Sequence, residues 1–146
     1  MKEKGYKFIE HTADVKVRCW GKNLEEAFSQ AALSLMATIS PNLEKIDQKI
    51  EREIKIESED KYALCLDFLT EFLYIFDVDE LIFSNIAVKS IRLKEESKYQ
   101  LEALVKGEKF NKNRHEIGIE VKAITYSFMN IEEKKDKVTI DIVFDI

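Results

Sequence analysis

The pattern of apolar and polar residues in the first half of the chain predicts strand, strand, helix and strand. Residues 15–20 ("VKVRCW") alternate between apolar and polar positions, as half-buried strands do. From Leu24 to Ile39 the apolar residues recur at spacings of three and four, which is typical of one helical face. Asn23 and Glu26 occupy the positions of a capping box before this helix, and Pro41 follows its end. Strands are expected over residues 6–10, 15–20 and 50–58.

The second half predicts one longer helix and then two pairs of strands. Ser58 or Asp60 opens the helix, which carries a broad apolar stripe through Phe76. The turns "KEES" and "EEKKDK" each separate two apolar runs, and the polar stretch "GEKFNKNRHEIG" predicts a loop between the two pairs. Strands are expected over residues 82–93, 99–106, 120–131 and 138–146.

Short turns between neighbouring strands favour antiparallel pairing. We therefore predict an α+β fold, a sandwich of a mainly antiparallel sheet with two helices packed on one face. The 146 residues, 45% of them hydrophobic, suffice for one core, and a single proline and four glycines leave little room for linkers. We expect one domain over residues 1–146.

The charge balance argues against one class of partner. The chain has 23 Lys and Arg residues against 28 Asp and Glu, a net charge of −5. Binding to a phosphate backbone is driven by Lys and Arg, which displace counterions. We therefore expect no strong direct binding of nucleic acid, and a basic protein or a cation as the more natural partner.

The sequence also predicts where the protein resides. The first residues are too polar for a signal peptide, and no apolar run approaches the roughly 18 residues of a membrane span, so we expect no membrane association. Cys19 and Cys65 lie in different elements without CxxC spacing. We interpret them as reduced thiols in the core of a cytoplasmic protein.

Asp14 and Asp145 are the acidic residues most suggestive of chemistry. Each lies at the edge of a predicted strand rather than in a charged run, and Asp145 precedes Ile146 at the end of the sequence. If the three meet in space, two side-chain carboxylates and a terminal carboxylate would either raise a carboxyl pKa or bind a hard cation such as Ca²⁺, Mg²⁺ or Mn²⁺. The alternative is two unrelated exposed aspartates, because sequence spacing does not show that they meet.

Other polar residues have weaker signals. His11 either caps a turn or contacts a partner beside Asp14, and Lys122, in the predicted strand with Glu120, is either solvated or an anion contact. The stretch "HEIGIE" lacks the second histidine of HExxH, so we expect no zinc site there. The acidic stretch "DVDE" (77–80) ends the second helix, where the helix dipole disfavours negative charge.

Five blocks together resemble the archease family. They are "EHTADV", "WGKNLEEAF", "LDFLTEFLYIFD", "HEIGIEVKAITY" and the terminal "VFDI", in the family's order along nearly the whole chain. The chain departs from the family pattern at Thr70, Ile119 and Ser127, none of which is an implied metal ligand.

The resemblance implies a function. Archeases activate the RtcB-type RNA ligase of tRNA splicing: they promote its guanylylation and multiple turnover and broaden its use of nucleoside triphosphates. It also implies a divalent cation, with Ca²⁺ favoured, held by Asp14, Asp145 and Ile146. His11, Glu120 and Lys122 are then candidates for supporting the site or contacting the ligase.

Two other functions remain open on sequence grounds. A stand-alone metal-dependent phosphohydrolase would need a base beside the metal, and only His11 offers itself. A chaperone-like binding module would need a large exposed apolar patch, which the alternating polar strand faces do not suggest. The resemblance implies a non-catalytic activator instead, and this is what we expect.

Overall fold

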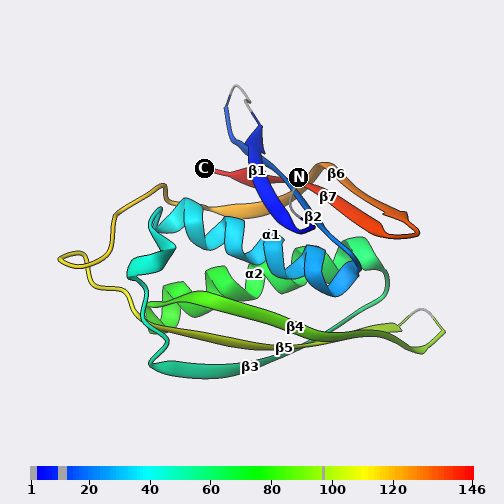
Figure 1. The fold of residues 1–146 in the computed structure, drawn as a ribbon, viewed down its shortest axis with the longest axis horizontal. Coiled ribbons are helices and arrows are strands. Elements are labelled where there is room, and N and C mark those ends of the chain that lie inside the picture. Colours follow the sequence, from blue (N-terminus) through cyan, green and yellow to red (C-terminus); the bar gives the residue numbers. More distant parts are fainter. Residues whose placement is uncertain (1–2, 10–12, 97) are drawn as a thin grey trace.

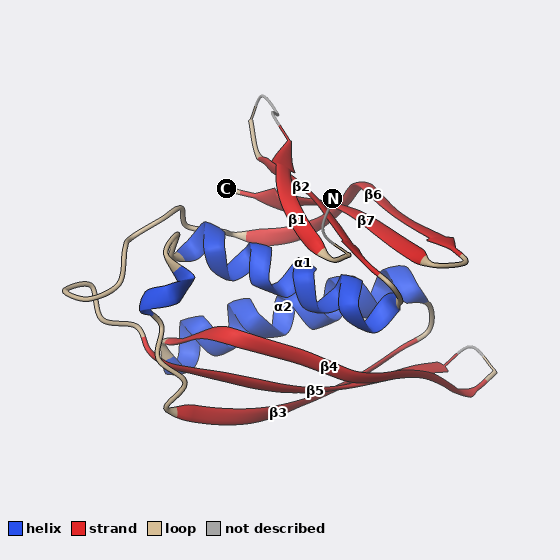
Figure 2. Cartoon of the chain, viewed as in Figure 1, coloured by secondary structure: helices blue, strands red, loops and turns tan. Residues whose placement is uncertain are grey.

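Two helices lie between two antiparallel sheets in the computed structural model, which describes residues 3–9, 13–96 and 98–146 (Figures 1 and 2). One sheet has four strands in the order β1-β2-β7-β6, and the other has three in the order β3-β5-β4. The elements are β1 (Gly5–Ile9), β2 (Val15–Gly21), α1 (Leu24–Ile39), the short 3-10 helix η1 (Leu43–Lys45), β3 (Ile50–Ser58), α2 (Lys61–Asp79), β4 (Leu81–Glu95), β5 (Lys98–Lys109), β6 (Ala123–Lys134) and β7 (Lys137–Asp145).

The α+β class and the antiparallel pairing are confirmed, but the predicted layering needs a correction. The strands form two sheets, with the helices between them, instead of one sheet with both helices on one face. The reason lies in α1, which buries small and polar residues such as Ser29, Ser34 and Thr38 as well as its apolar stripe. A periodic apolar pattern identifies only the apolar packing face of a helix. The small and polar face of α1 is also buried, and the pattern does not predict it.

Both predicted helix starts are confirmed. The side-chain oxygen of Asn23 accepts a hydrogen bond from the Glu26 N–H at 2.9 Å, and the Glu26 carboxylate accepts one from the Lys22 N–H at 2.8 Å. Asp60, rather than Ser58, caps α2 by accepting from the Ala63 N–H at 2.7 Å. These caps satisfy amides that the first helical turn leaves without partners.

Aromatic side chains connect the helices in the core. The Phe28 ring of α1 stacks with Phe68 of α2 at 6.3 Å between centroids. Phe68 then meets Phe72 edge-on at 5.1 Å, and Phe72 meets Phe83 of β4 at 5.9 Å. All four side chains are fully buried, so the core extends from α1 through α2 to the three-stranded sheet.

The two cysteines lie in this core, as expected. Cys19 and Cys65 are unbridged and buried. Burial raises the pKa of both thiols, that of Cys65 to about 12, so both stay protonated and unreactive. Separately, none of the helices in the described parts of the chain is long and apolar enough to cross a membrane.

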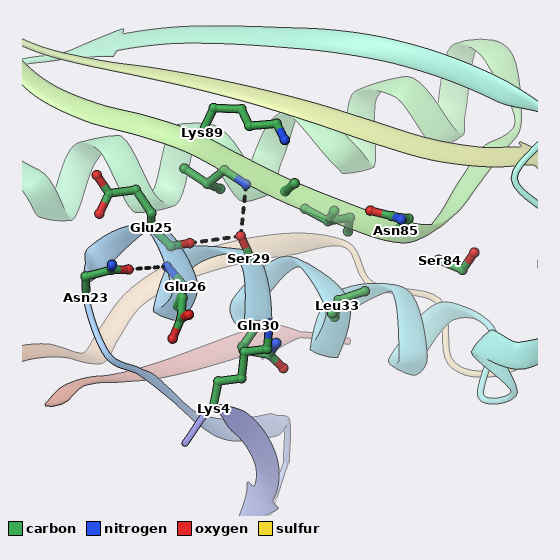
Figure 3. A pocket seen from close by; sticks show the side chains of 13 residues that line it. Lys4, Asn23, Glu25, Glu26, Ser29, Gln30, Leu33, Ser84, Asn85 and Lys89 are labelled. Carbon is green, nitrogen blue, oxygen red and sulfur yellow. Dashed lines mark hydrogen bonds between the residues drawn. The ribbon is translucent and has the colours of Figure 1, made fainter. Parts of the chain in front are cut away.

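Helix α1 covers the exposed edge of β4. The Val88 N–H donates to the Ser29 hydroxyl oxygen at 3.0 Å, and the Ile91 N–H donates to the Glu25 carboxylate at 3.2 Å. The Ser29 hydroxyl in turn donates to the Glu25 carbonyl at 2.8 Å (Figure 3). A hollow of about 650 Å³ lies along this junction, and two of its polar lining residues, Glu25 and Ser29, satisfy amides of the strand edge.

Replacing Ser29 should test this edge contact. In Ser29→Ala the amide of Val88, a residue only 8% exposed, loses its acceptor. We expect a loss of about 1–3 kcal/mol in the free energy of unfolding, measured by urea denaturation. Ser34→Ala is the control. The Ser34 hydroxyl donates to the Ala31 carbonyl within the same helix, so its removal leaves no β4 amide without an acceptor. Equal losses in the two variants would contradict the proposed edge contact.

Candidate functional site

The two predicted metal-binding aspartates lie at the same end of neighbouring strands. Strands β2 and β7 pair antiparallel from Gly21 and Val138 to Val15 and Phe144. Asp14 and Asp145 are the next residues beyond that last pair. Opposite residues of an antiparallel pair have their Cα atoms about 4.5–5.5 Å apart, so the pairing brings the two aspartates together from opposite ends of the chain.

The side chains of these residues supply only part of a cation site. Asp14 is half-buried and Asp145 is exposed, while Ile146 is half-buried and packs against the core. Nowhere in residues 3–9, 13–96 and 98–146 do three His, Cys, Asp or Glu side chains gather closely enough to hold a metal. The carboxylates of Asp14 and Asp145 therefore fit a hard cation only if further oxygens complete the ligand set. A terminal carboxylate at Ile146 would supply such oxygens.

The segment before β6 connects this site to α1. The Gly118 and Ile119 N–H groups donate to the carbonyls of Ile39 and Thr38 at 2.9 and 2.8 Å, at the C-terminal end of α1. A Cβ atom at Gly118 would lie 2.1 Å from the Thr38 carbonyl oxygen, so only glycine permits this approach. The Lys122 N–H then donates to the Asp145 carbonyl at 2.7 Å.

These bonds correct the predicted strand over residues 120–131. Strand β6 begins only at Ala123 and continues to Lys134. The preceding amides bind the end of α1, and a helix terminus with unsatisfied carbonyls competes with a strand for such donors. Glu120 and Lys122 are therefore exposed loop residues at the site. His11 lies outside the described residues.

A cavity of about 370 Å³ lies beside this segment. Its walls come from the C-terminal parts of α1 and α2 and from the loop that joins β5 to β6. Asp77, Glu120 and Lys122 supply its charged side chains. Because Lys122 also bonds to Asp145 through its main chain, the cavity adjoins the aspartate pair.

A buried ionic network holds the loop that forms this cavity. The Glu108 carboxylate accepts hydrogen bonds from the Asp47 N–H at 2.6 Å, from the His115 imidazole at 2.9 Å and from the Arg114 guanidinium. Glu108 is 6% exposed and His115 is 3% exposed. Burial by itself would raise the pKa of Glu108, but the hydrogen bonds from Asp47 and His115 and the charge of Arg114 together lower it. Glu108 is therefore a buried carboxylate.

His115 has a structural role that the sequence motif did not reveal. Its Nδ1 accepts from the Asn111 N–H at 2.9 Å, which places the proton on Nε2, the atom that donates to Glu108. Its ring stacks on Phe110 at 5.8 Å between centroids, and Phe110 meets Phe76 of α2 edge-on at 5.8 Å. We find no sequence signal for this network beyond the proximity of Glu108, Arg114 and His115 in a polar loop.

Comparison with known proteins places the chain in a family. The model of the archease protein family (MTH1598/TM1083) matches residues 6–146. The chain belongs to the archease family. It is 38% identical over 143 residues to the protein archease of Methanosarcina mazei, covering 98% of this chain and 97% of that one. It is 43% identical over 131 residues to the archease of Pyrococcus furiosus, covering 90% of each.

Solved structures share the fold. Protein 1598 of Methanobacterium thermoautotrophicum matches with a TM-score of 0.81 at 29% identity, over 97% of this chain and 99% of that one. A protein of Thermotoga maritima, described as an archease and possible chaperone, matches with a TM-score of 0.58 at 23% identity, over 96% of each chain, which shows the fold alone. The archease match includes the aspartate pair and the loop from Glu108 to Lys122.

The network at Glu108 predicts a pH dependence of stability. Because folding lowers the pKa of Glu108, its carboxylate stabilises the fold above the ordinary glutamate pKa of 4.5, and this contribution is lost as the pH falls through the lower pKa of the folded state. In Glu108→Gln we expect a loss of roughly 1–3 kcal/mol at neutral pH and a shallower fall in stability below about pH 4.5. Urea denaturation across this pH range measures both.

Glu57→Gln is the matched control. Its hydrogen bond with Lys94 also lowers the pKa of Glu57, but this pair is exposed to solvent. Salt on the order of 1 M, where the Debye length is about 3 Å, should erase the effect of Glu57→Gln and leave most of that of Glu108→Gln. Equal salt sensitivity of the two variants would count against the buried network.

Proposed function

We propose that this archease-family protein activates an RtcB-type RNA ligase, promoting its guanylylation and multiple turnover and broadening the nucleoside triphosphates it accepts. One observation carries the proposal: the β2–β7 pairing brings Asp14 and Asp145 together, at the positions where the family resemblance implies the metal site. The family assignment supports a protein partner, and the choice of the RNA ligase is what the resemblance implies.

The proposed site would hold a divalent cation, Ca²⁺ in the first place and Mg²⁺ or Mn²⁺ as alternatives. Asp14, Asp145 and the terminal group of Ile146 would be its ligands, since carboxylate oxygens suit hard cations. When bound, the cation supplies positive charge at the ends of β2 and β7. The half-buried position of Asp14 and the exposed position of Asp145 support a site that faces a partner.

The chain's own residues would act by favouring one state of the ligase. A ligase that binds triphosphates and RNA needs a basic surface, and this acidic protein with a net charge of −5 is complementary to it. Glu120 and Lys122 are exposed beside the aspartate pair and are candidate contacts, as is His11. Binding more tightly to the state competent for nucleotidyl transfer than to the other states would raise the population of that state.

Ligation with RNA in excess over ligase tests the proposal. With the protein present, guanylylated ligase should form faster, and each ligase should join many RNA molecules. The protein alone should join no RNA and release no phosphate, because we expect a non-catalytic activator. Gel analysis of ligated RNA and of labelled covalent guanylate measures the two effects.

Each alternative function has its own outcome in the same experiment. Release of phosphate by the purified protein alone would support the metal-dependent phosphohydrolase instead. Equal rescue of the ligase and of unrelated denatured proteins, without faster guanylylation, would support the chaperone-like module. Unchanged turnover of the ligase would refute the proposed activation.

The proposed metal site makes a second prediction. Asp14→Asn and Asp145→Asn each remove one negative charge of three, and a one-glycine extension converts the Ile146 carboxylate into an amide and moves the charge about 3.3–3.6 Å away. Hard cations are held by charge count as well as geometry, so all three variants should fold yet lose at least tenfold in Ca²⁺ affinity and lose ligase activation. Calorimetric titration with CaCl₂ and the ligation assay measure this.

One control accompanies these variants. Asp136→Asn removes an exposed carboxylate in the turn between β6 and β7 and should preserve both properties. Full activation by the glycine-extended protein would refute the terminal ligand while leaving the two aspartates standing. Unchanged Ca²⁺ binding in Asp14→Asn and Asp145→Asn would refute the site.

A further inference from the structure

The cavity beside the aspartate pair combines apolar walls with acidic side chains. Seven apolar side chains line it, among them the half-buried rings of Phe76 and Phe110, which meet edge-on at 5.8 Å. Asp77 at the end of α2 and Glu120 of the loop bring two carboxylates to the same cavity, and both residues are exposed. Lys122 is the one basic residue in the lining.

The carboxylates of this cavity lack counter-ions of their own. Among the described residues, neither Asp77 nor Glu120 has an ion pair within 4.0 Å, whereas Asp79, two residues further along α2, pairs with Arg52 at 3.0 Å. No basic residue lies in the last turn of α2, whose C-terminus is the negative end of its dipole. The potential in the cavity therefore favours a positive occupant.

The shape and lining narrow the choice of that occupant. A volume of about 370 Å³ with aromatic walls accepts the aliphatic stem and flat head of a long side chain. A guanidinium stacks on aromatic faces, pairs with carboxylates through a planar fork and is more weakly hydrated than an ammonium. Arginine therefore fits better than lysine or a purely apolar side chain.

We propose that this cavity receives an arginine side chain of the partner protein, with its guanidinium between Asp77 and Glu120 and its stem against Phe76 and Phe110. This inference rests on the proposed function for the identity of the partner, the RNA ligase, but not for the chemistry of the cavity. Because Lys122 lies next to Asp145, an arginine bound here would fix the orientation of the partner relative to the aspartate pair.

The chemistry of the cavity is tested without the ligase. N-acetyl-arginine amide is titrated into the isotope-labelled protein, and N-acetyl-citrulline amide, its uncharged isostere, is titrated in parallel. The arginine probe should shift the amide signals of Ile119, Glu120 and Lys122 with a dissociation constant on the order of 1 mM. The citrulline probe should bind at least tenfold more weakly.

Three variants determine whether the cavity charges are responsible. Asp77→Asn/Glu120→Gln should weaken arginine binding at least tenfold, while Lys122→Gln, which removes a repelling charge, should strengthen it. The control is Glu95→Gln/Asp136→Asn, which also removes two negative charges, but from the hairpin tips at the opposite end of the molecule (Figure 1). It should leave arginine binding unchanged. Equal binding of the two probes, or of the arginine probe to both double variants, would overturn the proposal.

The ligase provides the second arm. Asp77→Asn/Glu120→Gln should bind the ligase at least tenfold more weakly than the charge-matched control does, measured by surface plasmon resonance. If the control activates the ligase and the cavity variant binds it equally well, the arginine pocket is refuted and the proposed function stands. If wild-type protein neither binds nor activates the ligase, the proposed function fails, and the probe titration alone decides whether the cavity binds arginine.

Discussion

The antiparallel pairing of β2 with β7 is the constraint on which the rest of the structure depends. These strands come from near the two ends of the chain and form the centre of the four-stranded sheet. The pairing fixes its own register because Val17, Cys19 and Ile142 must face the core, and a slip of one residue would turn each of them to the opposite face. The same register sets Asp14 beside Asp145, so packing of the core determines the geometry of the candidate site.

Helix α1 connects this site to the other half of the molecule. Along its length it satisfies the edge of β4 through Ser29, and at its end it accepts two amides from the loop before β6 (Figure 3). That loop is held on its other side by the buried carboxylate of Glu108 and by His115. A change in the loop would therefore reach the main-chain bond between Lys122 and Asp145. The cavity and the aspartate pair are joined through this one bond, so a partner that fills the cavity would lie close to the aspartates.

The acidic end of α2 differs from an ordinary surface helix end. Helix C-termini favour basic side chains, yet this one carries Asp77 and Asp79 and is capped by Glu80 in the left-handed conformation, at a φ of 57°. Such an arrangement costs stability in the isolated protein. A basic partner would offset the electrostatic part of that cost on binding, which gives the acidic helix end a use in recognition.

The sequence by itself determined both helices and most strands, and it proposed the residues of the candidate site. Local patterns sufficed for both helices, for the cap at Asn23 and for most strands, because spacing and capping are properties of neighbouring residues, while the structure chose Asp60 over Ser58 as the second cap. The family blocks identified Asp14 and Asp145. Only the tertiary structure decided that the strands divide into two sheets, because the second packing face of α1 is small and polar. It alone decided that the residues before Ala123 leave the strand to bind α1, and that two helix ends and a loop enclose a cavity, because these contacts join residues far apart in the chain and no local pattern records them.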